Sequence, residues 1–288
     1  PVVLFFTGGG APCEVYVRLL REMGRSWRVL VVEREGYGRS IRGDDTGEEG
    51  TSSSRGKQIM ARDSAEELSA LLRVMGVKGP YVLVAHSYGA IVAREFLDVQ
   101  GVHLDKVVGL ALIEPASELL YQTHKPVIPP PAFDAVLKGV DVDKVTRLRE
   151  ESGMTDAEWD DAIRGIEKTA PGAALEECRA SGRILADKHQ LTRHVMSPWP
   201  VAVLRCNWAV ELQKLFDAGV EAGNGSDEER KQVREFLWAW RAFDDEVRAG
   251  LDMAEGGVTR RYTYFEECGH DVPSRRPDVV IQEVGWVM

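Results

Sequence analysis

Apolar runs of strand length alternate with amphipathic stretches over the first 117 residues. The apolar runs contain β-branched residues, which is typical of strands that are buried on both faces of a parallel sheet. The stretches between them repeat apolar positions at helical spacing. This alternation predicts a mostly parallel sheet with right-handed crossovers and helices on both faces. The expected strands are Val2–Phe6, Trp27–Val32, Tyr81–Ala85 and Val107–Ile113, and the expected helices are Glu14–Met23, Ile59–Met75 and Ala90–Val99.

The pattern changes after the fourth expected strand. Residues 118–198 contain helical segments, a proline run at Pro129–Pro131 and no clear strand, which predicts an inserted helical cap. Strand-like sequence then resumes, so residues 1–117 and 199–288 are expected to form one α/β core with about six strands. Arg42–Lys57 is rich in Gly, Ser, Thr, Asp and Glu, which predicts a mobile surface loop. The remaining expected elements are Val201–Leu204, Ser226–Met253, Tyr262–Phe265 and Pro277–Val287.

The chain carries 46 acidic and 36 basic residues and a formal net charge of −10. A nucleic-acid-binding protein would present a basic face to the phosphates, so this charge disfavours that class and favours a soluble protein. No apolar run reaches the roughly 20 residues that a membrane-spanning helix requires. The cysteines form no C-x-x-C pair, so no zinc site, redox site or disulfide scaffold is expected, and reduced thiols in a cytoplasmic protein are the simplest interpretation. They are Cys13, Cys178, Cys206 and Cys268.

The third strand leads into the sequence Ala85-His86-Ser87-Tyr88-Gly89, and a helix follows at once. A serine on a sharp strand-to-helix turn needs small neighbours, and the turn lifts its hydroxyl clear of the sheet. The N-terminus of the next helix then faces the substrate, where it favours developing negative charge. This pattern predicts Ser87 as a nucleophile. The alternative is a chance pentapeptide in an ordinary strand–turn–helix unit.

Four short blocks occur in the order found in the α/β-hydrolase superfamily, and the chain resembles that family in them. The loop Thr7–Gly10 resembles its H-G-G-G loop, residues 33–40 resemble D-x-x-G-x-G-x-S, and the serine turn resembles G-H-S-x-G-G. The fourth block is Gly269-His270 near the end of the chain. The resemblance covers the core, whereas the cap resembles no family. The departures are Ala85 for a glycine, Thr7 for a histidine and Ala209 for an aspartate.

The resemblance implies an α/β-hydrolase fold and a base near the C-terminus. A serine hydroxyl is a weak nucleophile until a base removes its proton. His270 follows the last expected strand, where that family places its histidine, so His270 is the expected base and an ordinary loop histidine is the alternative. His86 lies inside the serine turn and is expected to be structural. The other histidines lie in the cap or on a helix-to-strand connection: His103, His124, His189 and His194.

A tetrahedral intermediate needs amide donors that point at its oxyanion. The resemblance implies the N–H of Tyr88, the residue after the nucleophile, as one donor. It places the second donor in the glycine loop, at Gly9 with Gly10 as the neighbouring option; the alternative for this loop is a flexible turn. Gly10 and Trp208 are expected to contact the substrate, although an aromatic such as Trp208 is often a core residue.

The acid that would orient His270 has no residue in its usual place, because Ala209 stands there. Glu114 follows the fourth strand at its carboxyl end and would face the site, so it is the expected acid; its alternative is a capping or solvated glutamate. Asp271 adjoins His270, and neighbouring side chains seldom point at each other. Further candidates lie in the later helical stretch: Asp217, Asp244 and Asp245.

The resemblance implies acyl transfer to water through an acyl-serine intermediate, with no metal and no organic cofactor. The apolar content of the cap favours a small-molecule substrate, namely a medium-sized apolar ester, lactone or thioester. A cofactor-free lyase on the same fold and a small-molecule receptor that has lost turnover are the alternatives, since fold does not determine function. Aspartate-nucleophile hydrolases are disfavoured because residue 87 is serine.

Overall fold

The computed structural model describes residues 1–41, 58–99, 106–122, 129–196, 199–252 and 260–288. The expected loop at Arg42–Lys57 lies outside these residues. Six strands pair in parallel in the order β2-β1-β3-β4-β5-β6, which confirms the predicted α/β class. The strands are β1 (Val2–Phe6), β2 (Arg28–Val31), β3 (Tyr81–His86), β4 (Val107–Ile113), β5 (Val201–Cys206) and β6 (Arg260–Phe265).

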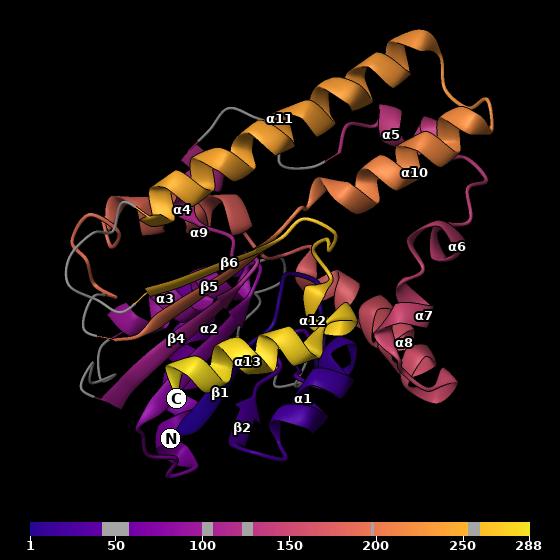
Figure 1. Cartoon of the computed structure of the whole chain (residues 1–288). Coiled ribbons are helices and arrows are strands. Elements are labelled where there is room, and N and C mark those ends of the chain that lie inside the picture. The colour runs from indigo at the N-terminus through magenta and orange to yellow at the C-terminus, as the bar shows by residue number, and fades with distance from the viewer. Residues whose placement is uncertain (42–57, 100–105, 123–128, 197–198, 253–259) are drawn as a thin grey trace, which may run out of the picture.

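Side chains along each strand alternate between two apolar layers, one on each face of the sheet. Leu83 belongs to the layer under α2 and α3, and its neighbour Val84 belongs to the layer under α1 and α13. Figure 1 shows α1 and α13 lying along one side of the sheet. The inner strands β1, β3, β4 and β5 are therefore buried on both faces, as continuous apolar runs predict, whereas the edge strands β2 and β6 are only partly buried. The helices are α1 (Val17–Met23), α2 (Ala61–Val74), α3 (Gly89–Asp98) and α13 (Pro277–Val287), and the 3-10 helix η1 (Cys13–Tyr16) precedes α1.

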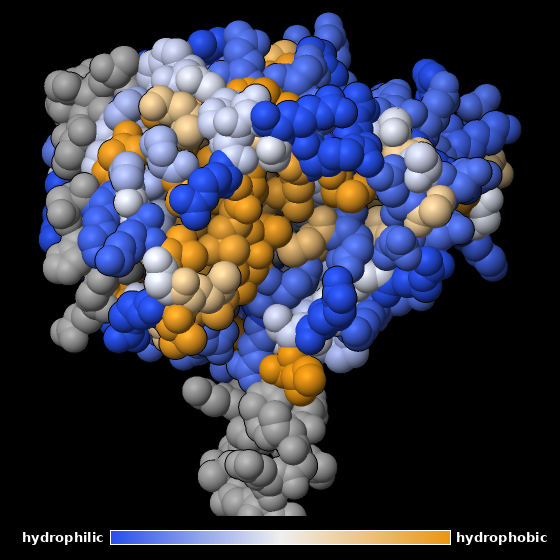
Figure 2. All heavy atoms as spheres, turned by 90° about the horizontal axis from the view of Figure 1, so that it is seen from below, coloured by the Kyte–Doolittle hydropathy of each residue, from blue (hydrophilic) through white to orange (hydrophobic). Residues whose placement is uncertain are grey.

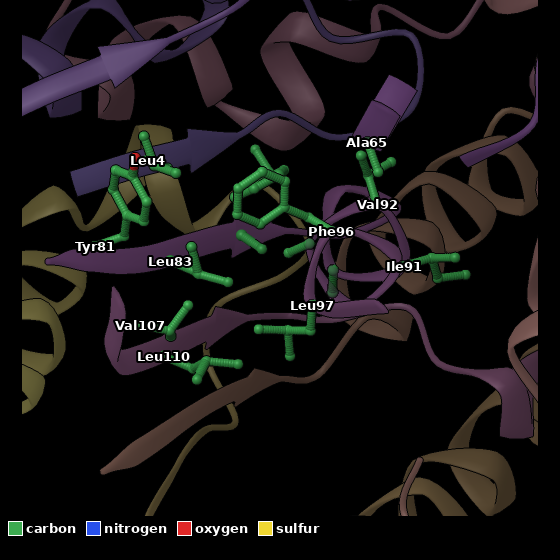
Figure 3. Packing of buried hydrophobic residues seen from close by; sticks show 14 of the residues in the cluster. Leu4, Ala65, Tyr81, Leu83, Ile91, Val92, Phe96, Leu97, Val107 and Leu110 are labelled. Carbon is green, nitrogen blue, oxygen red and sulfur yellow. The ribbon is translucent and has the colours of Figure 1, made fainter. Parts of the chain in front are cut away.

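The layer under α3 fixes the helix that follows the serine turn. Figure 3 shows Phe96 and Leu97 pointing from α3 toward the strands that carry Leu83 and Leu110. All four side chains are at most 4% exposed. Burying a side chain of this size contributes roughly 1.5–3 kcal/mol. The apolar face of α3 thus holds its N-terminus at the carboxyl edge of the sheet, where ligand sites of parallel sheets form.

Two helical insertions follow β4 and β5. The first insertion lies between β4 and β5. In the described part of residues 118–198 it contains helices and no named strand, as the sequence predicts. The second, α10 and α11, lies between β5 and β6 and packs with α5 in an apolar cluster of its own. Figure 1 shows these three helices together, away from the lower part of the sheet. The helices of the first insertion are α4 (Glu118–Gln122), α5 (Ala132–Val136), α6 (Val142–Thr146), α7 (Leu148–Ser152), α8 (Asp156–Ala173) and α9 (Cys178–Asp187), and those of the second are α10 (Ala209–Glu221) and α11 (Asp227–Asp252). The short helix α12 (Val272–Arg275) follows β6.

The lower end of the molecule, where both chain ends lie, presents an apolar area. Figure 2 looks at this end from below and shows apolar residues gathered in the middle of the face, with hydrophilic residues around them. The helices α10 and α11 lie at the opposite end in Figure 1, so this area is separate from the second insertion. Within the described ranges, no helix is long and apolar enough to cross a membrane.

Candidate active site

Ser87 lies on the turn between β3 and α3, with its side chain half-buried. Its backbone φ of 52° falls in the left-handed region, which a non-glycine residue adopts only when its surroundings hold it there. The Ser87 N–H donates to the Ile113 carbonyl at 3.1 Å, and the Ser87 carbonyl accepts from the Ala116 N–H at 3.0 Å. The end of β4 therefore holds the strained turn on both sides.

Gly89 lets α3 start directly against the end of β1. A methyl group on Gly89 would lie 2.4 Å from the Phe6 carbonyl oxygen and 2.6 Å from that of Thr7. These distances are far below van der Waals contact, and both atoms belong to backbone. The small residue two positions after Ser87 thus has a physical reason: it brings the serine turn next to the glycine loop.

We expect Gly89→Ala to lower the free energy of unfolding by about 3 kcal/mol, because the added methyl group must push β1 and α3 apart. Gly285→Ala is the matched control, since Gly285 also lies in a helix but a methyl group there would lie 3.7 Å from Trp27. In the control, replacing a helical glycine with alanine should raise the free energy of unfolding by about 0.5–1 kcal/mol, because alanine favours the helix more than glycine does. Urea unfolding of both variants measures the difference, and equal effects would contradict the close approach at Gly89.

His270 reaches Ser87 from the loop between β6 and α12. Its Nε2 lies 2.9 Å from the Ser87 Oγ. A hydrogen bond fixes the main chain of His270, because the carbonyl of His270 accepts from His86 Nε2 at 3.0 Å. His86 Nδ1 lies 2.8 Å from the hydroxyl of Tyr16. The structure therefore brings the two expected catalytic side chains together, and His86 has the structural place that its position in the turn predicts.

Both imidazole rings are neutral near pH 7. Burial lowers the pKa of His86, which suits a ring that accepts from Tyr16 at Nδ1 and donates from Nε2. Burial, and then the positive charge of Arg205, lowers the pKa of His270 to about 4. A neutral His270 that accepts the Ser87 proton at Nε2 carries its own hydrogen on Nδ1. Among the described residues, Nδ1 has no hydrogen-bond partner.

Glu114 lies at the carboxyl end of β4, where the sequence places it, and its side chain is buried. One carboxylate oxygen pairs with Arg205 Nη1 at 2.8 Å, and the other accepts from the Cys206 N–H. The hydrogen bond from His270 Nδ1 to Glu114 that a triad implies is not formed. Arg205 is instead the charged group that acts on His270, and Glu114 is its counter-charge.

Glu211 is a carboxylate near His270 that the sequence pattern missed. It lies in the first turn of α10, two residues beyond Ala209, and a methyl group on Gly269 would fall 1.3 Å from its Oε2. Arg275 lies 3.6 Å from its other oxygen. Burial raises the pKa of Glu211. A search that allowed the acid to shift by two residues along the chain would have found it.

The other acidic candidates have different places. Asp217 is exposed on α10 and accepts from Gln213 at 2.8 Å. Asp271 precedes α12, and burial raises the pKa of its carboxyl. The side chains of Asp244 and Asp245 lie outside the described residues. Glu114 thus lies beside Arg205, the charged neighbour of His270, and Glu211 lies beside Gly269, the residue before His270. In the part of the chain that is described, no group of three or more His, Cys, Asp or Glu side chains could hold a metal ion.

The glycine loop presents one unoccupied amide toward solvent. The Gly8 N–H donates to the Tyr16 hydroxyl at 2.9 Å, and the Gly10 N–H donates to the Tyr37 hydroxyl at 2.8 Å. The Gly9 N–H has no acceptor among the described residues, and Gly9 is exposed. A methyl group on Gly9 would lie 3.5 Å from Tyr88 Cβ, so Gly9 is next to the residue that follows the nucleophile. The geometry therefore favours Gly9 over Gly10 as an oxyanion donor.

Tyr88 provides a second amide from the start of α3, where the first N–H groups of a helix have no intrahelical acceptor. Trp208 lies beside His270. Its ring centroid is 5.8 Å from that of His270 in an edge-on arrangement, and 3.7 Å from that of Trp240 on α11. The second insertion thus reaches the base through a pair of aromatic rings.

The comparisons with known proteins agree with this fold. The sequence model of the alpha/beta hydrolase family matches residues 3–283. A protein of Gibberella zeae named as an AB hydrolase superfamily protein is 28% identical over 99% of this chain and 85% of its own length. A thermophilic esterase from Thermogutta terrifontis has a TM-score of 0.52 at 17% identity, over 99% of this chain and 88% of that one. A putative epoxide hydrolase from Pseudomonas aeruginosa has a TM-score of 0.56 at 17% identity, over 99% and 87%. The chain belongs to the alpha/beta hydrolase family.

Proposed function

We propose that this protein is a serine hydrolase that cleaves ester-type bonds through an acyl-serine intermediate. The observation that carries the proposal is the 2.9 Å contact between Ser87 Oγ and His270 Nε2 on a strained strand-to-helix turn. The esterase among the structural relatives shares only the fold at its level of identity, so the chemistry is argued from the site.

In the first half of the proposed reaction, the Ser87 oxygen attacks the carbonyl carbon of the substrate. His270 Nε2 takes the hydroxyl proton and later gives it to the leaving alcohol or thiol. The amides of Gly9 and Tyr88 stabilise the tetrahedral oxyanion. In the second half, His270 takes a proton from water as the water oxygen attacks the acyl carbon. The bond between the acyl carbon and the Ser87 oxygen then breaks, the carboxylic acid leaves, and His270 returns the proton to Ser87.

Glu114 has an electrostatic part in this proposal. When His270 becomes an imidazolium, its charge meets that of Arg205, and Glu114 offsets the guanidinium through the 2.8 Å pair. Opposite charges at such distances interact by about 4 kcal/mol near a protein surface. We propose Glu114 as the acid that lowers the free energy of the His270 imidazolium by offsetting the charge of Arg205. It does this without a hydrogen bond to His270 Nδ1.

The proposed substrate is a small apolar ester, lactone or thioester. Trp208 lies edge-on to His270 and Trp240 packs against Trp208 at a tilt, so an apolar group attached to the reacting carbonyl would meet aromatic rings. Gly10 and the cap would line the opposite side; because the Gly10 amide is already used by Tyr37, Gly10 would contribute shape alone.

A panel of p-nitrophenyl esters, aryl lactones and acyl thioesters tests the activity. We expect turnover of at least one class, with higher kcat/KM for apolar acyl groups than for charged ones of equal size. Absence of turnover across the panel, together with failure of a fluorophosphonate to label Ser87, would contradict the proposal. Labelling of Ser87 without turnover would instead favour a lyase or a receptor.

The activity should persist into mildly acidic solution. Only neutral His270 can accept the Ser87 proton, and desolvation together with Arg205 lowers the pKa of His270 to about 4. The free enzyme should therefore lose kcat/KM as pH falls through about 4, rather than through about 6.5, the value of an unperturbed histidine. A kcat/KM profile between about pH 3.5 and pH 8, with circular dichroism at each pH to confirm folding, measures this limb. An acid limb near 6.5 would mean that Arg205 and burial do not act on the base as described.

A further inference from the structure

A buried arginine holds the backbone of the glycine loop. Arg34 follows β2 and is 7% exposed. Its Nη1 donates to the Thr7 carbonyl at 2.7 Å, and its Nη2 donates to the Gly8 carbonyl at 2.7 Å. The C=O and N–H groups of a trans peptide point in opposite directions. Because the Gly8 carbonyl points at Arg34, the N–H of Gly9 in the same peptide points away from it, toward the free side of the loop.

A carboxylate from the cap holds Arg34 in turn. Glu176 lies between α8 and α9, and its side chain is 2% exposed. It accepts from Arg34 Nε at 2.6 Å and from the hydroxyl of Tyr37. That hydroxyl is also the acceptor of the Gly10 N–H. Glu176 therefore contacts both side chains that hold the loop around Gly9. Arg34 binds the carbonyls before Gly9, and Tyr37 binds the amide after it.

The main chain around Glu176 is attached to the core. Glu176 forms a parallel bridge with Ile59, whose carbonyl accepts from the Glu177 N–H at 2.9 Å. A methyl group on Gly9 would lie 3.9 Å from the Glu176 Oε2 and 3.5 Å from Tyr88 Cβ. The loop thus lies between the cap carboxylate and the start of α3, which carries the other proposed oxyanion donor.

We propose that Glu176 is a positioning residue that presets the oxyanion donors, so that the cap contributes to the chemical step itself. The inference rests on the proposed function. Glu176 orients Arg34 and Tyr37. These two side chains form hydrogen bonds with the neighbouring carbonyls and with the Gly10 amide, so the Gly9 N–H remains directed at the oxyanion. Donors fixed before the reaction stabilise the transition state without reorganisation, whereas a loop without Glu176 would need to be ordered during it.

Glu176→Gln tests the inference with p-nitrophenyl butanoate as substrate and an alkylboronic acid as the probe of the tetrahedral state. We expect kcat to fall about 10- to 100-fold, a part of the loss caused by deleting an oxyanion donor. KM should stay within about threefold, because the ground-state ester does not use these amides fully. The inhibition constant of the boronic acid should rise by the same factor as kcat falls.

Glu118→Gln is the matched control. Glu118 is also a buried carboxylate of the cap and pairs with a buried arginine, Arg94, whose Nη2 donates to it at 2.8 Å. It lies against α3, and in the described part of the chain none of its hydrogen bonds or ion pairs is with the glycine loop. Both variants should melt at a lower temperature, because each leaves a buried guanidinium without its full partner. The control should keep kcat and the boronic acid constant within about threefold of the original chain.

Tyr37→Phe keeps the inference testable if Glu176→Gln does not fold. It leaves the Arg34–Glu176 ion pair and removes the acceptor of the Gly10 N–H. We expect kcat to fall about 5- to 20-fold with KM nearly unchanged. If either variant lowers kcat no more than Glu118→Gln, or raises KM while kcat is kept, Glu176 does not position the donors. If the original chain shows no turnover that depends on Ser87, the proposed function has failed instead, and the two outcomes are distinguishable.

Discussion

Replacing Ser87 with alanine should lower ester turnover by on the order of 10⁴-fold or more, as losing the nucleophile does in other serine triads. The fold should be unaffected, because His270 is the one hydrogen-bond partner of the Ser87 Oγ among the described residues and the backbone contacts of the turn remain. The positive φ at residue 87 will still be held by the end of β4. The measurement is kcat/KM for the best ester of the panel, with melting temperature recorded for both chains.

Ser64→Ala is the control for this experiment. Ser64 lies in α2, is buried, and its hydroxyl has no hydrogen-bond partner among the described residues. Its removal takes away a serine hydroxyl without touching the site, so turnover should stay within about twofold. Turnover that survives in Ser87→Ala, with the control also active, would reject a serine nucleophile.

Replacing Glu114 with glutamine should lower kcat on the order of 10³-fold, somewhat less than the loss of a triad aspartate. The amide no longer offsets the positive charge of Arg205 as the Glu114 carboxylate does, and the pKa of His270 already lies low because of burial and Arg205. The imidazolium that forms during the reaction then meets a positive charge that residue 114 no longer offsets. The variant should also lose about 3 kcal/mol of stability, because a buried pair has lost one partner.

A double variant separates the two roles that Glu114 could have. If Glu114 acts as the counter-charge of Arg205, Glu114→Gln with Arg205→Met should recover much of the lost kcat, because the positive charge that acts on His270 has been removed as well. If Glu114 binds His270 directly during turnover, the second substitution should recover nothing. Glu211→Gln is the companion experiment: a loss there larger than in Glu114→Gln would assign the acid to α10 and show that our assignment is wrong.

The strands and the serine turn were predictable because their causes are local. A strand buried on both faces must be apolar throughout, so β1 and β4 have the same bounds in the sequence pattern as in the structure. Residue 89 has to be glycine because a Cβ atom there would lie 2.4 Å from the Phe6 carbonyl oxygen at the end of β1. Constraints of this kind determine the residue types at a few adjacent positions, so they can be recognised in a single sequence.

The partners of the charged side chains were not predictable, because they come from distant parts of the chain. Arg34 and Glu176 are 142 residues apart and meet only after the cap has folded onto the core. Glu114 could be placed at the end of a strand, but its pairing with Arg205 depends on the order β4-β5-β6, which no local pattern contains. The helical stretch Ser226–Met253 was predicted close to the bounds of α11, but no local pattern shows that α10 and α11 pack with α5 in a separate cluster.

The most direct test of the account is the rate at which a fluorophosphonate modifies the protein, with the modified residue identified by peptide mass spectrometry. The account predicts a single adduct on Ser87, formed at least about 10³-fold more slowly in His270→Gln, because the hydroxyl then has no base at 2.9 Å. An adduct on another residue, or modification of Ser87 at the same rate without His270, would contradict it.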